Sequence, residues 1–136
     1  MRKSLAAILA TEKKYTSETV MAMPEEGFSF KPTDTVWEFR ELIHHMVYSI
    51  EWMNNAYLEN NKTAWDPGAV SGKKDRLVNG MNDAFDKLEQ TFSRSTAADE
   101  TLVPALYSIL LHNAHHRGQA TTYLRCNGIT PPDYPF

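Results

Sequence analysis

The stretch Leu111-His112-Asn113-Ala114-His115-His116-Arg117-Gly118-Gln119 places His112 and His116 four residues apart. In a helix, residues at this spacing lie on the same face, one turn from each other. Each imidazole could then offer one nitrogen to a shared metal ion, but two ligands from one helix seldom hold a divalent cation alone. A third ligand has to come from elsewhere, and outside this stretch the only histidines are His44 and His45.

Four stretches of the chain predict long helices. Apolar residues recur at helical spacing over residues 2–22, 35–60 and 73–92, and a fourth helix is expected from a first turn at Pro104 to Cys126, where Asn127-Gly128 closes it. Thr35-Val36-Trp37-Glu38 fits a capping box, which predicts that the second helix begins near residue 35. With no strand pattern between them, these helices predict an all-α four-helix bundle.

The remaining segments read as connections. Residues 28–32 are expected to be extended, with Phe28 and Phe30 tucked beneath the helices, and residues 61–71 form a turn-rich loop. Trp65 in that loop is either a cover over the edge of the core, the commoner role, or a substrate contact. The proline-rich tail 129–136 cannot be helical.

Composition narrows the class of protein. A chain of 136 residues suits a single domain spanning residues 1–136, and 42% hydrophobic with 23% charged residues is typical of a globular protein. A net charge of -3 gives no general reason to bind nucleic acid or an anionic membrane. Cys126 is the only cysteine, which excludes an internal disulfide. The apolar run after the basic N-terminus is too short for a signal peptide, so we expect a cytoplasmic protein.

Helical spacing chooses between the two neighbouring histidines of the second helix. His45 shares its face with apolar or small residues, whereas His44 shares its face with polar and charged ones, so His45 is expected to point inward and His44 to lie at the rim. His112 and His116 lie on a stripe that also looks buried, and His115 points elsewhere. The residues compared are Leu42, Ser49, Trp52 and Ala56 for His45, Arg40, Tyr48 and Glu51 for His44, and Ala105, Ile109, Ala120 and Tyr123 for the pair.

His45, His112 and His116 are therefore the candidate metal ligands, a three-histidine set of the kind that leaves a coordination position open in catalytic zinc sites. Two other interpretations stand beside this one. An inward histidine is often only a hydrogen-bonded core residue. Glu41-Leu42-Ile43-His44 has the Glu-x2-His spacing of di-iron bundles, but those sites need a second such motif, which the sequence lacks. Cys126 is interpreted as a packed or idle thiol.

The motifs together resemble the DinB-like (DinB/YfiT) superfamily of metal-dependent four-helix-bundle proteins. The resemblance covers almost the whole chain. It is carried by Met23-Pro24-Glu25-Glu26 through Phe30-Lys31-Pro32, by Glu41-Leu42-Ile43-His44-His45-Met46, by His112-x3-His116-Arg117-Gly118-Gln119, and by Tyr123-Leu124-Arg125 with Asn127-Gly128-Ile129-x-Pro131-Pro132.

The resemblance implies an up-down-down-up order of helices, with His45, His112 and His116 as ligands of a divalent metal such as Zn, Ni or Fe. It implies a homodimer and metal-dependent transfer that involves low-molecular-weight bacterial thiols, including bacillithiol and mycothiol. Arg117, Gly118 and Gln119 are expected to serve helix contacts and to support the ligands. A thiol transferase or hydrolase acting on a small molecule is the leading hypothesis, and a non-catalytic stress-response bundle with a structural metal is the alternative.

Overall fold

The computed structural model describes residues 1–70 and 72–136. Four long helices make up most of it: α1 (Arg2–Ala22), α2 (Phe39–Met53), α3 (Lys74–Arg94) and α4 (Asp99–Cys126). Two short helical turns, η1 (Glu25–Ser29) and η2 (Asn54–Leu58), follow α1 and α2. No strand occurs in the described residues. The expected all-α four-helix bundle is confirmed.

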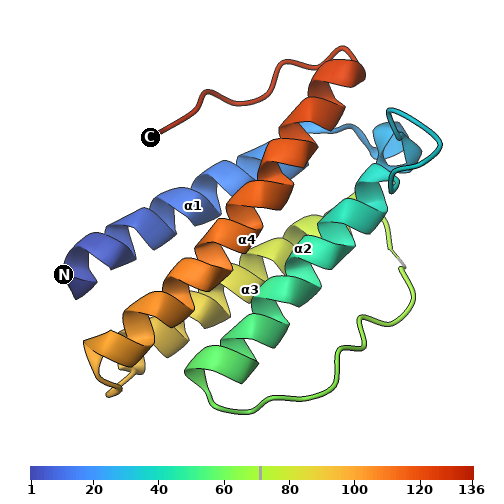
Figure 1. The fold of residues 1–136 in the computed structure, drawn as a ribbon. Helices are drawn as coiled ribbons and strands as arrows, with labels where there is room; N and C mark the ends of the chain where they lie inside the picture. The colour runs from blue at the N-terminus through green and yellow to red at the C-terminus, as the bar shows by residue number, and fades with distance from the viewer. Residues whose placement is uncertain (71) are drawn as a thin grey trace.

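The helices surround one core in an order that differs from their order in the sequence. α1 packs on α3 and α4, and α2 also packs on α3 and α4, so α1 and α2 lie at opposite corners. Figure 1 shows α1 and α4 running one way and α2 and α3 the other. The segment between α2 and α3 therefore travels back along the length of the bundle. This is the up-down-down-up order that the resemblance implied.

The core is built from the apolar stripes of all four helices. Along α3, the residues with helical spacing are buried, from Leu77 through Phe85 to Phe92. Phe28 in η1 is 1% exposed and meets Phe39, the first residue of α2, with 5.2 Å between ring centroids. Phe28 is thus tucked beneath the helices as predicted, although its segment is a 3-10 turn where an extended connector was expected.

Two predicted helix starts were wrong. α2 begins at Phe39 because Glu38, not Thr35, forms the capping box: the backbone N–H of Glu38 donates to Glu41 Oε2 at 2.7 Å. The residues before it form turns and bends instead of a helical turn, and the Trp37 carbonyl accepts a hydrogen bond from the distant Tyr123 hydroxyl at 2.8 Å. Sequence spacing alone cannot show such a contact.

The start of α4 was placed too late. The helix begins at Asp99, so Pro104 lies inside it and not in its first turn. Asp99 and Glu100 occupy that turn, where carboxylates interact favourably with the helix dipole. The Arg2 guanidinium also donates to Asp99 Oδ1 at 2.7 Å. These contacts favour the earlier start.

The other bounds agree more closely. The second helix continues close to residue 60 as expected, but its last turn, η2, is π-helical. The tail after Gly128 contains no helix, as predicted. Within the described chain, none of the helices has the combination of length and apolar character that crossing a membrane requires.

Candidate metal centre

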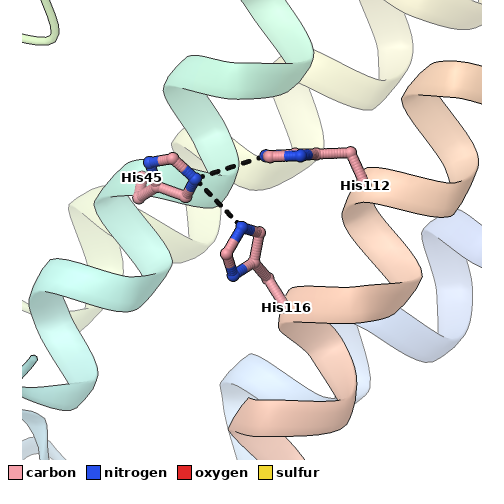
Figure 2. Close-up of side chains that lie close together, drawn as sticks. All are labelled: His45, His112 and His116. Carbon is pink, nitrogen blue, oxygen red and sulfur yellow. Dashed lines mark hydrogen bonds between the residues drawn. The ribbon is translucent and has the colours of Figure 1, made fainter. Parts of the chain in front are cut away.

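Three imidazoles converge between α2 and α4, which are packed against each other. His45 comes from α2, and His112 and His116 come from successive turns of α4; Figure 2 shows the three rings facing one another across the gap between the helices. His45 Nε2 lies 3.2 Å from His112 Nε2 and 3.1 Å from His116 Nε2. One nitrogen from each ring falls within 4.8 Å of the other two, so the three together could hold a metal ion.

The other histidines lie outside this cluster. His44 Nε2 lies 2.8 Å from the Pro67 carbonyl oxygen, in the loop between α2 and α3. His115 is exposed on α4. The facing argument from the sequence therefore agrees with the geometry for all five histidines. Binding of a metal by His45, His112 and His116 stays a prediction.

The contacts among the three rings fit a shared cation better than a set of hydrogen bonds. A ring nitrogen carries either one proton or one lone pair, so His45 Nε2 cannot make two full hydrogen bonds to its two neighbours. Three lone pairs directed at one point would repel each other unless a positive ion lay between them. The donor set, neutral imidazole from three residues, suits zinc and other borderline divalent metals.

Burial and mutual repulsion keep the three imidazoles neutral. The pKa of His45 is lowered to about 4, first by burial and then by His116, His112 and His44. Burial also lowers the pKa of His112, and His116 and His115 add to the effect. The pKa of His116 is lowered by burial, against an opposing hydrogen bond to Gln119. Neutral rings at physiological pH are the form that binds metals.

Two polar side chains contact the rings: Gln119 from behind His116, and Ser49 at the nitrogen of His45 that faces the cluster. His116 Nδ1 lies 2.8 Å from Gln119 Oε1, an acceptor, so the proton of the neutral ring belongs on Nδ1 and the lone pair on Nε2 points into the cluster. Ser49, one turn after His45, lies with its Oγ 3.3 Å from His45 Nε2 and donates to the His45 carbonyl at 2.6 Å. Gln119 thus contacts one of the candidate ligands, as expected.

Aromatic side chains border the cluster on the α2 side. The ring of Trp37 lies 5.0 Å from that of His45 and 6.4 Å from that of His116, centroid to centroid. Trp65 lies 5.7 Å from His45 and 4.7 Å from Tyr48. The sequence analysis missed Trp37, because its assignment to a helix gave no reason to look for it beside the histidines. Trp65 lies next to the site, a position that suits both a cover over the edge of the core and a contact with a substrate.

A groove of about 510 Å³ opens beside the cluster, within the range of small-molecule sites. Its lining comes from the segment before α2, from α2 itself and from the second half of α4. The residues that line it are Pro32, Thr35, Val36, Trp37, Leu42, His116, Gln119, Thr122 and Tyr123. A hollow of similar size between α1 and α3 is lined by none of the three histidines.

Glu41 and Tyr48 are the side chains near the histidines that could act as a general base, and both are engaged in other contacts. Glu41 Oε2 accepts the backbone N–H of Glu38 and so caps α2. The Tyr48 hydroxyl accepts the backbone N–H of Asp66 at 2.9 Å, which ties the loop after α2 to the helix. Cys126 is exposed, so its thiol is not packed.

Arg117 serves a helix contact, as expected. Its guanidinium pairs with Glu12 of α1, and both side chains are less than a tenth exposed, at 6% and 8%. Asn113, one turn before it, donates to Glu12 Oε2 at 3.2 Å and to Thr16 Oγ1 at 2.9 Å. The guanidinium also lies 4.6 Å from the ring centroid of Tyr15. This network lies one residue from His116 and joins α4 to α1.

A model of the DinB family matches residues 1–135. The chain belongs to the DinB family. Among solved structures, this DinB family protein is similar to a DinB-like protein, YjoA, from Bacillus subtilis, with 19% sequence identity and a TM-score of 0.73 over 98% of this chain and 96% of that one. At that identity the likeness shows the fold alone. No curated protein in the comparison is significantly similar to the chain.

Proposed function

We propose that this DinB family protein is a metal-dependent enzyme that activates a thiol, or alternatively water, at a divalent ion held by His45, His112 and His116. The observation that carries the proposal is the convergence of three Nε2 atoms beside a groove large enough for a small molecule. Histidine ligands in this number leave a coordination position open, which distinguishes catalytic from structural zinc sites.

A divalent ion at this point would lower the pKa of a thiol or water and so supply a nucleophile near neutral pH. Other residues of the protein surround the three histidines and would support this role. Gln119 fixes the tautomer of His116, and Ser49 contacts His45 on its own helix. The rings of Trp37 and Trp65 lie 5.0 Å and 5.7 Å from that of His45, centroid to centroid. The groove would position the second substrate beside His116.

The resemblance to the family is what favours transfer over hydrolysis. The two substrates of the transfer are also part of the proposal. We propose a low-molecular-weight thiol as nucleophile and an electrophilic small molecule as acceptor. In that reaction the thiolate sulfur forms a bond to an electrophilic carbon, the leaving group departs with its bonding electrons, and the thiol proton passes to solvent.

A structural metal is the alternative. The three histidines join α2 to α4, and an ion between them would link two helices that are far apart in sequence, adding its binding free energy to the folded state. Two observations favour this reading: the cluster lies within the helix interface, and neither Glu41 nor Tyr48 is available as a general base without loss of its present contact.

Incubating the metal-loaded protein with several thiols and electrophiles, followed by product detection, separates the two. Catalysis predicts turnover that is abolished in His45→Ala while far-UV circular dichroism shows the bundle intact. His115→Ala is the matched control, because it removes an exposed histidine of α4 next to the site. Turnover that survives His45→Ala would contradict the proposal. Absence of turnover combined with a large loss of thermal stability on chelation would favour the structural role.

A further inference from the structure

The groove beside His116 has a side chain composition that restricts what can enter it. Its walls are mainly apolar: Val36 and Trp37 from the segment before α2, Leu42 from α2, and Tyr123 from α4. No carboxylate, lysine or arginine belongs to the lining among the described residues. A charged group that entered it would lose water without gaining a partner of opposite charge, which is costly.

The polar groups of the lining are already engaged within the protein. The Tyr123 hydroxyl donates to the Trp37 carbonyl at 2.8 Å, and the Thr122 hydroxyl donates to the Gly118 carbonyl at 3.1 Å. Gln119 Oε1 lies 2.8 Å from His116 Nδ1. The lining therefore offers few free donors for an anionic group, and hydrogen bonds alone would not replace its hydration.

The surrounding charge also disfavours anions. Burial raises the pKa of Tyr123, and the carboxylate of Glu41 raises it further, so the charge that acts on this wall is negative. Arg40, the neighbouring cation on α2, is paired with Glu38 at 3.1 Å. In the metal-free protein, the charge around the groove thus matches a neutral occupant and opposes a carboxylate or phosphate.

Trp37 gives the groove a flat apolar surface. It is 47% exposed, yet its backbone is fixed by the Tyr123 hydroxyl, and its ring lies 5.0 Å from that of His45. A large aromatic side chain whose backbone is anchored and whose ring is open to solvent is suited to stacking on a planar group. The arrangement places such a group directly beside the three histidines.

We propose that the groove selects an uncharged, ring-bearing substrate, which stacks on Trp37 with its reactive atom towards His45 and His116, and that it rejects carboxylate-bearing analogues. The assignment of this ligand as a substrate rests on the function proposed above. The specificity of the groove is inferred from the residues that line it, and a binding measurement can test it without any turnover.

Isothermal titration of the full chain, treated with a chelator so that no carboxylate can bind an ion, compares 1,3-dinitrobenzene with 3,5-dinitrobenzoate. The two probes share a ring and differ by one negative charge. We expect the neutral ring to bind about tenfold more tightly or better, the ratio that corresponds to one unpaired charged group. Equal affinities, or a preference for the carboxylate, would overturn the inference.

Two variants locate the binding. Trp37→Ala should weaken binding of the neutral ring by roughly fivefold to tenfold, as expected for the loss of one aromatic contact. Tyr107→Ala is the matched control, since Tyr107 is 48% exposed on α4 and does not line the groove. Thr122→Lys places a cation at an exposed helical position of the lining and should raise the affinity for dinitrobenzoate. Unchanged affinities in both Trp37→Ala and Thr122→Lys would show that the probes bind elsewhere.

A turnover experiment separates this inference from the proposed function. Metal-loaded protein is given a thiol with either 1-chloro-2,6-dinitrobenzene or 4-chloro-3,5-dinitrobenzoate, which differ only in the carboxylate and from which the thiolate displaces chloride. Ring binding that depends on Trp37, without turnover, would uphold the selectivity of the groove and count against catalysis. Turnover at equal rates with the two electrophiles would count against the selectivity of the groove and would still support catalysis.

Discussion

The buried Arg117–Glu12 pair yields the most quantitative prediction about the stability of the bundle. Arg117→Met would leave the Glu12 carboxylate buried, with Asn113 as its remaining donor. Removing one partner of a buried ion pair costs about 3–5 kcal/mol because the other charge is left without compensation. For a domain of this size we expect the melting temperature to fall by about 10–18 °C.

Urea unfolding of chelator-treated protein, followed by circular dichroism, measures the effect without a contribution from metal. Arg125→Met is the matched control, because Arg125 is exposed near the end of the same helix, and it should change the unfolding free energy by less than ~0.5 kcal/mol. The double variant Glu12→Leu/Arg117→Met should recover much of the loss, since no charge is then stranded. An unfolding free energy of Arg117→Met within ~1 kcal/mol of that of the parent protein would refute the reasoning. So would a double variant whose loss of stability equals the sum of the losses in Glu12→Leu and in Arg117→Met.

The remaining predictions concern the histidines. The folded-state pKa of His45 is lowered to about 4 and those of its two partners are also lowered, so below the ordinary value of 6.5 the unfolded chain binds more protons than the folded one. The unfolding free energy of the metal-free protein should therefore fall as the pH drops from 6.5 towards 4, and His45→Ala should flatten that slope; an unchanged slope in urea titrations at several pH values would contradict the stated cause. Gln119→Ala should weaken metal binding by roughly 10-fold, because the His116 ring loses the acceptor that orients it, whereas Thr122→Ala at an exposed position on the same helix should not. Competition with a chromophoric chelator measures both affinities, and equal values for the two variants would rule out the orienting role of Gln119.

Much of the bundle could be predicted because its helices carry their own periodicity. The stripe of α3 and the pairing of His112 with His116 follow from spacing within one helix, which a sequence displays directly. The choice of His45 over His44 follows from the same logic, since Arg40 and Glu51 could not share a buried face. These inferences need no knowledge of what the helix packs against.

The errors arose where long-range contacts decide local structure. Trp37 was assigned to a helix because Thr35 to Glu38 matches a capping pattern, but this segment is not helical, and its Trp37 carbonyl is bound by the hydroxyl of Tyr123, 86 residues away. Likewise, the partner of Arg117 is Glu12, 105 residues earlier, and no spacing rule connects them. A single sequence gives no information about such pairs.

The central claim is that His45, His112 and His116 bind one divalent ion, and metal analysis of protein purified without a histidine tag tests it most directly. After reconstitution with Zn, Ni or Fe and removal of loosely bound ions, we expect about one ion per chain, because the described residues contain one such cluster of three histidines. The ion should be lost in the double variant His112→Ala/His116→Ala and retained in His115→Ala. Substoichiometric metal in the parent protein, or the same metal content in the double variant, would contradict the account.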